Sequence, residues 1–114
     1  MKPTYWQNQV PTPPFFAVIF VSVKSGDLAG YEETDQRLMA EVSKQPGFLG
    51  YSNAASADGG IFISYWQDMA SIEAWRRAPR HMNAKEQARS RWYHYYLSLI
   101  TEVKSISEFD SELG

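Results

Sequence analysis

The chain of 114 residues contains no cysteine and only two histidines. Without cysteine it forms neither disulfides nor thiolate-ligated zinc or iron–sulfur sites, and it has no thiol nucleophile. Its longest apolar run, residues 15–23, is far shorter than the roughly 20 residues that a membrane-spanning helix requires. Neither sign of charge dominates, since the formal net charge is −2, and this argues against a nucleic-acid partner.

The N-terminal residues also lack the apolar stretch of a signal peptide. We therefore expect a cytoplasmic protein that is not attached to a membrane, with one domain at residues 15–106. Four of the six prolines fall in residues 1–14, which predicts an extended N-terminal arm. Tyr5 and Trp6 in this arm pack on the domain or on a second subunit, unless the arm is disordered. Residues 107–114 form an acidic tail.

Strands are predicted where β-branched and aromatic residues run together between turn signals, at residues 15–24, 48–53, 61–66 and 95–106. A first helix is predicted at residues 30–45, between two glycine-containing breaks. Asp68 is a good N-cap for a second helix, which carries Ile72 and Trp75 inward. Pro79 interrupts that helix, and a further helical piece is expected at residues 80–91.

The resulting order, β-α-β-β-α-β, predicts a ferredoxin-like α+β fold with a four-stranded antiparallel sheet and helices on one face. The strands at residues 15–23 and 61–66 are apolar at both alternations, so the face without helices should also be buried. A second copy of the same sheet covers that face at least cost. We therefore predict a homodimer that forms through the sheet face, with the two sheets paired into a dimeric α+β barrel.

Four short motifs then suggest a family. They are PGFLGY at residues 46–51, SYW at 64–66, AW at 74–75 and WYHYY at 92–96. In this order and spacing the sequence resembles the antibiotic-biosynthesis-monooxygenase (ABM) domain family, of the dimeric α+β barrel superfamily, over residues 15–106. The resemblance implies a cleft between the sheet and the helices. Members of the family include anthrone oxygenases that need no cofactor, quinol oxygenases and haem-degrading enzymes.

The resemblance to the cofactor-free oxygenases extends to Trp66, which matches a tryptophan that those enzymes place in the cleft. Phe62 and Ile72 stand where they carry an asparagine and a tyrosine. The resemblance implies a cofactor-independent monooxygenase for a small planar aromatic or quinol ligand. The two apolar replacements favour instead a non-catalytic binding or stress-associated module. In such a module the side chains of the protein itself fill the cleft, and both alternatives stay open.

Haem binding or degradation is the least favoured alternative. In the haem-degrading branch a histidine ligand follows the helix tryptophan by ten residues, and counting from Trp75 gives Lys85. His81 lies about one helical turn before that position. The first strand also lacks the asparagine of that branch. We therefore expect neither a cofactor nor a metal ion.

For the oxygenase we assign candidate roles. His81 is the candidate proton acceptor, because histidine titrates near neutral pH. Arg89 is the candidate anion stabiliser, in a segment, residues 76–91, that holds six basic side chains and one acid. The alternative for both is a solvated helix surface, and for Trp66 it is packing in the core. The candidate substrate-binding residues are Trp66, Phe62, Ile72, Trp75 and Trp92.

Overall fold

The computed structural model describes residues 6–78 and 91–112 of the chain. The elements within them follow the predicted order, β-α-β-β-α-β. They are β1 (Phe15–Lys24), α1 (Tyr31–Val42), β2 (Phe48–Ser56), β3 (Gly59–Trp66), α2 (Met69–Arg76) and β4 (Tyr93–Val103). The helical piece predicted at residues 80–91 lies outside the described residues, apart from Arg91.

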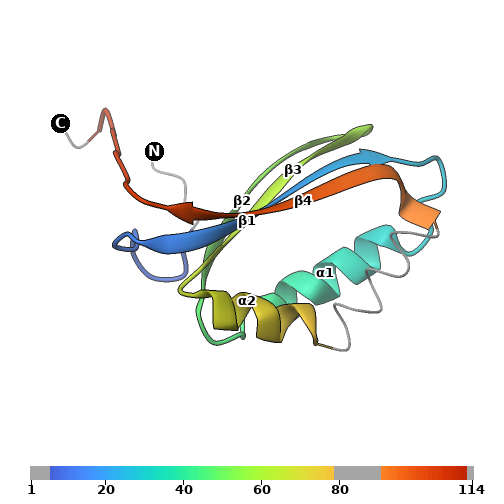
Figure 1. Cartoon of the computed structure of the whole chain (residues 1–114). Helices are drawn as coiled ribbons and strands as arrows, with labels where there is room; N and C mark the ends of the chain where they lie inside the picture. The colour runs from blue at the N-terminus through green and yellow to red at the C-terminus, as the bar shows by residue number, and fades with distance from the viewer. Residues whose placement is uncertain (1–5, 79–90, 113–114) are drawn as a thin grey trace.

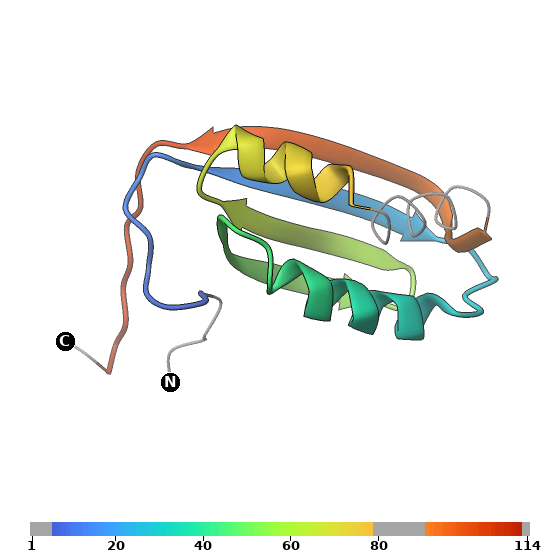
Figure 2. The same cartoon turned by 90° about the horizontal axis from the view of Figure 1, so that it is seen from below.

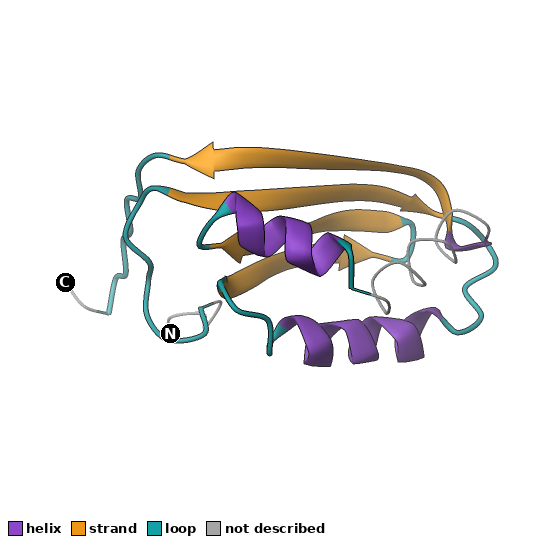
Figure 3. Cartoon of the chain, turned by 60° about the horizontal axis from the view of Figure 1, so that its bottom comes forward, coloured by secondary structure: helices purple, strands orange, loops and turns teal. Residues whose placement is uncertain are grey.

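The four strands form one sheet in the order β2-β3-β1-β4, and every neighbouring pair is antiparallel. Both helices lie on the same face of this curved sheet (Figures 1 and 2). Among the described residues no helix covers the opposite face, as the view by secondary structure also shows (Figure 3). The predicted ferredoxin-like fold is therefore confirmed.

The strand register assigns side chains to the two faces. Ile19 lies opposite Ile63 on β3 and Leu99 on β4, and residues paired across a ladder share a face. The next residue, Phe20, lies opposite Phe62 and Ser98, on the face that the helices cover. Branched side chains thus continue across the face without helices, here called the outer face. Five residues of the outer face are strongly exposed: Val23, Ile61, Tyr95, Leu97 and Leu99.

Pairing with β1 determines where β4 begins and ends. Tyr93 pairs with the last residue of β1, Lys24, and Val103 pairs with its first, Phe15. The last strand was predicted at residues 95–106, which begins and ends too late in the sequence. It ends at Val103 because no β1 residue lies opposite the chain beyond that point. Similarly, α1 ends before the predicted residue 45, and β2 continues to Ser56, where it pairs with Gly59.

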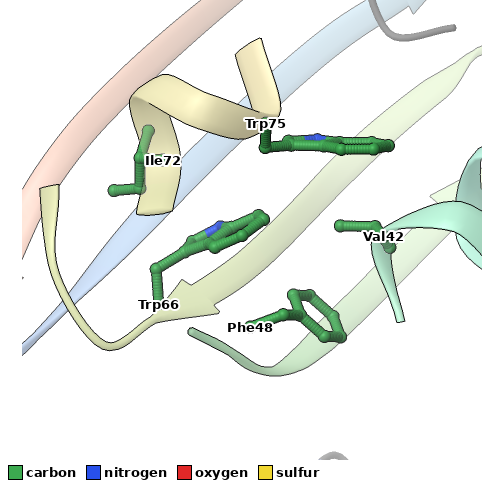
Figure 4. Packing of buried hydrophobic residues seen from close by; sticks show 5 residues of the cluster. All are labelled: Val42, Phe48, Trp66, Ile72 and Trp75. Atoms are coloured by element: carbon green, nitrogen blue, oxygen red, sulfur yellow. The ribbon is translucent and has the colours of Figure 1, made fainter. Parts of the chain in front are cut away.

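The core lies between the sheet and the helices. Its buried cluster is shown in Figure 4, where Ile72 and Trp75 point from α2 toward Trp66 on β3. Phe48 packs edge-on against Trp66, with ring centroids 5.3 Å apart. The prediction that Ile72 and Trp75 face inward is confirmed.

The N-cap predicted for the second helix is confirmed. The Asp68 carboxylate accepts a hydrogen bond of 2.8 Å from the Ser71 backbone N–H, so Asp68 is the N-cap of α2.

Trp6 packs on its own domain, with its ring centroid 4.7 Å from that of Tyr65 and 6.2 Å from that of Phe15. Tyr5 lies outside the described residues.

Candidate functional site

A cavity of about 640 Å³ lies between the sheet and the two helices. All four strands contribute to its wall, together with both helices and Trp92. Its volume is in the range of cavities that hold small organic ligands. The cavity follows α1, whose first residue, Tyr31, and last residue, Val42, both line it. At 1.5 Å per residue, these two ends of the helix are roughly 16 Å apart.

The end of the cavity near Val42 is apolar. Trp66 and Ile72 are 0% and 1% exposed there, and Trp75 is also buried. The indole N–H of Trp66 donates a 2.8 Å hydrogen bond to the Ser64 hydroxyl, so this end leaves no described polar side-chain atom buried without a partner. Such a wall binds a flat hydrocarbon surface rather than a charged group.

The middle of the cavity is lined by aromatic rings that stack across neighbouring strands. Phe62 on β3 stacks on Tyr51 of β2, with ring centroids 5.7 Å apart. On the same face, toward the other edge of the sheet, Phe20 of β1 stacks on Tyr96 of β4, with ring centroids 5.3 Å apart. These rings present a broad, flat surface, which suits a planar ligand.

The end of the cavity near Tyr31 is polar. The Tyr93 hydroxyl donates a 3.2 Å hydrogen bond to the Tyr31 hydroxyl, joining β4 to α1. Lys24 Nζ lies 5.0 Å from the centroid of the Tyr31 ring and also reaches the Ser56 carbonyl, at 3.4 Å. Asp35, one helical turn after Tyr31, lines the same end.

Two groups at this polar end have displaced pKa values. Burial is the main cause that raises the pKa of the Tyr93 phenol well above its ordinary value of 10.0, and the hydrogen bond to Tyr31 adds to the effect. Tyr93 therefore stays protonated at neutral pH. Asp35 is solvent-exposed at the rim of the cavity, yet partial burial of its carboxylate raises its pKa above 3.8, and the nearby Lys24 charge partly opposes this rise.

Trp92 closes the cavity where β4 begins. Its indole N–H donates to the Ala29 carbonyl at 2.9 Å, and its ring packs edge-on against Tyr31 at 5.4 Å. Arg91 donates to the same carbonyl at 2.8 Å and lies 3.8 Å from the Asp27 carboxylate. The loop before α1 is thereby held against the start of β4.

All five candidate substrate-binding residues line this cavity: Phe62, Trp66, Ile72, Trp75 and Trp92. The candidate proton acceptor His81 and the candidate anion stabiliser Arg89 lie outside the described residues, as does Lys85, so the structure describes no contact of theirs.

Neither Asp35 nor the Tyr31–Tyr93 pair was predicted from the sequence as part of the site. Asp35 could have been found, because it follows Tyr31 by four residues and precedes Leu38 by three, on the apolar side of the predicted helix. The tyrosine pair spans 62 positions of the chain and left no local signal.

Other site types find no support in residues 6–78 and 91–112. No group of three or more histidine and acidic side chains is placed there to hold a metal ion. None of the helices described is long and apolar enough to cross a membrane.

Comparison with known proteins relates the chain to a family. The family model for antibiotic biosynthesis monooxygenase matches residues 14–87. The chain belongs to this family. A relative from Bacillus subtilis (strain 168), YqjZ, described as uncharacterised, is 45% identical over 97 residues, which cover 84% of this chain and 85% of that protein.

Solved structures agree on the fold of the family. SnoaB of Streptomyces nogalater, described as a cofactor-independent oxygenase, superposes with a TM-score of 0.64 over 84% of this chain and 97% of its own, at 15% identity. SO0527 of Shewanella oneidensis superposes with a TM-score of 0.69 over 81% of this chain and 93% of its own, at 9% identity. At these identities the likeness extends to the fold alone.

Proposed function

We propose that this protein is a cofactor-independent monooxygenase that acts on a small planar aromatic or quinol substrate. The observation that carries the proposal is the cavity of about 640 Å³, with aromatic walls along its length and hydroxyl groups at one end. Membership of the monooxygenase family and the activity named for SnoaB support the same reaction class.

The chemistry asks little of the protein beyond binding and proton transfer. A deprotonated anthrone or hydroquinone is electron-rich enough to reduce dioxygen by itself. For an anthrone, the reactive CH₂ group and O₂ become a carbonyl group and water. The protein must hold the flat ring, accept one proton and stabilise the anion until oxygen reacts.

The five lining residues supply the binding surface in this proposal. Trp66 and Trp75 form the closed apolar end, against which the hydrocarbon part of the substrate lies. Phe62 adds a flat wall in the middle through its stack with Tyr51. His81 and Arg89 keep their predicted roles as proton acceptor and anion stabiliser.

We also propose that the protein is a homodimer joined through the outer face of the sheet. Ile61 and Leu99 are 46% and 44% exposed on that face, and each has branched or apolar cross-strand neighbours. A continuous apolar sheet surface of this kind is unfavourable in water, and a second copy of the same surface buries it.

The oxygenase proposal is tested by dioxygen uptake with a simple anthrone and a panel of hydroquinones, without added metal or flavin. We expect the folded protein to accelerate uptake over a heat-denatured control. Ser98→Trp places a large ring in the cavity and should reduce the rate at least tenfold. Gln36→Trp, on the exposed side of α1, should leave it unchanged.

The main alternative gives a different result. A non-catalytic binding module accelerates no uptake with any substrate of the panel but still binds planar aromatics, and Ser98→Trp then abolishes binding alone. If the protein accelerates no dioxygen uptake but still binds the ligands, the oxygenase proposal is wrong and the binding module takes its place.

A further inference from the structure

The cavity is polarised along α1, and its two ends make different demands on a ligand. The end near Val42 is walled mainly by hydrocarbon and aromatic carbon, and the Trp66 indole N–H there is bonded to Ser64. The end near Tyr31 collects a lysine, a carboxylate and a pair of tyrosine hydroxyls. A ligand that satisfies both ends is a flat ring system with an oxygen substituent at one extremity.

The tyrosine pair provides a hydrogen-bond donor at that extremity. Because Tyr93 donates to Tyr31, the Tyr31 hydroxyl still has its own hydrogen to give to a ligand oxygen. The buried Tyr93 phenol, with its raised pKa, stays neutral and keeps this orientation over the accessible pH range. The pair therefore donates to a ligand oxygen and does not remove its proton.

Asp35 is the one carboxylate among the described residues that line the cavity. It lies one turn after Tyr31 on α1, so both side chains reach the same end. Asp35 is solvent-exposed, but partial burial of its carboxylate raises its pKa, and the Lys24 charge partly opposes this rise, so Asp35 is more basic than an ordinary aspartate. That combination suits a general base.

We infer that this cavity binds hydroxylated aromatic compounds with the hydroxyl at the Tyr31 end, where the Asp35 carboxylate accepts the hydroxyl proton and Tyr31 donates to the same oxygen. The substrate O–H bond breaks, an O–H bond forms on the carboxylate, and the electron pair stays on the substrate oxygen. Lys24 then faces the new anion. This inference rests on the proposed function, narrows its substrate class to phenols and hydroquinols, and gives the role of proton acceptor to Asp35 in place of His81.

The charge at this end stays balanced during the transfer. Before the proton transfer, the negative charge near the Lys24 ammonium is on the Asp35 carboxylate. After the transfer, the negative charge is on the phenolate and Asp35 is neutral. Four further titratable side chains line the cavity from the surrounding elements, and none of them is a carboxylate: Tyr51 of β2, Arg76 of α2, and Tyr93 and Tyr96 of β4.

The test compares two ligands that differ only at the oxygen. Binding of 2-naphthol and of its methyl ether, 2-methoxynaphthalene, is measured by calorimetry between about pH 4 and pH 8. The wild type should bind 2-naphthol about tenfold more tightly at neutral pH, because a hydrogen bond to a charged acceptor is strong. This preference should decline as the pH falls and Asp35 is protonated. The ether should show no such dependence.

Variants assign the effect to Asp35. Asp35→Asn should weaken 2-naphthol binding about tenfold, abolish the pH dependence of the preference and leave the ether unaffected. Glu32→Gln removes the same charge from an exposed position of the same helix and should change neither ligand. Unchanged 2-naphthol binding in Asp35→Asn, or a wild type that binds neither ligand or both equally, would overturn the inference.

These outcomes are separable from the oxygenase test. If Asp35→Asn loses the preference but the wild type accelerates no dioxygen uptake, the phenol site stands and the oxygenase proposal is wrong. If uptake is accelerated and Asp35→Asn binds 2-naphthol like the wild type, the oxygenase stands and Asp35 is not its base.

Discussion

At the scale of single residues, Asp35 is a position where binding chemistry and stability oppose each other. The Asp35 carboxylate, our proposed proton acceptor, lies at the rim of a mainly aromatic cavity, and partial burial there disfavours its charge. Because its folded-state pKa is raised, its contribution to stability is largest below the ordinary pKa of 3.8 and is lost as the pH rises through the folded value.

Asp35→Asn should therefore stabilise the fold at neutral pH, by less than about 1 kcal/mol because solvent at the rim screens the charge. Urea unfolding at about pH 7 and about pH 3.5 measures this, and the difference from wild type should vanish at the lower pH. Glu32→Gln should give no gain, since a negative charge near the N-terminus of α1 is favourable. A destabilised Asp35→Asn at pH 7 would mean that attraction to Lys24 outweighs burial.

How far the sequence predicts individual residues depends on their neighbours along the chain. Trp66, Ile72 and Trp75 were assigned to the cleft from the family resemblance, with helical spacing turning Ile72 and Trp75 inward, and all three line the cavity. Asp35 was not, because a polar residue on a helix of unknown orientation is usually solvated. Its surroundings come from β1 and β4, which only the folded chain brings together.

At the scale of elements, the approach of β3 to β1 depends on Gly59. Its φ of 152° is unfavourable for other residues, and a Cβ at this position would lie 2.1 Å from the Ser22 carbonyl oxygen of β1. The backbones meet here because Gly59 pairs with Val23 and directly follows the turn between β2 and β3.

Gly59→Ala should destabilise the protein by more than about 2 kcal/mol, through backbone strain and the clash with β1. Gly26→Ala is the matched control, because a Cβ at Gly26 meets no atom within 4 Å, and it should change stability by less than about 0.5 kcal/mol. Chemical denaturation of both variants measures the contrast. Equal stabilities would show that β1 and β3 separate here at little cost.

Element order was readable from the sequence because each strand and helix shows its own periodicity. The element ends were not. The chain after Val103 keeps apolar residues such as Ile106, which suggested a longer strand, but β1 begins at Phe15 and offers no further partner. The small residues at the end of β2 have weak strand propensity, and pairing with β3 holds them in the sheet.

At the scale of the whole molecule, the two faces of the sheet are buried by different means. The helices cover one face and enclose the cavity (Figure 1). On the outer face Trp6 covers the end with Phe15 and Tyr65, while residues such as Leu99 stay exposed in a single chain. Residues of β1 alternate between these faces, so Phe20 reaches the cavity and Ile19 the outer face. Joining two outer faces would therefore also support the cavity wall from behind.

The homodimer is best tested by placing a charge on the outer face. The wild type should sediment at twice the chain mass of 13.1 kDa. Leu99→Glu, in the apolar row with Ile19 and Ile63, should weaken association at least a hundredfold, because a carboxylate would be buried against its own copy.

Met69→Glu introduces the same charge at an equally exposed apolar position, but on α2, in the layer that faces away from the proposed interface. It should leave the mass unchanged, and a carboxylate also suits the first turn of a helix. A monomeric wild type, or dissociation by Met69→Glu alone, would move the interface off the sheet. If Leu99→Glu yields monomers that also bind 2-naphthol more weakly, the cavity depends on support from the partner copy.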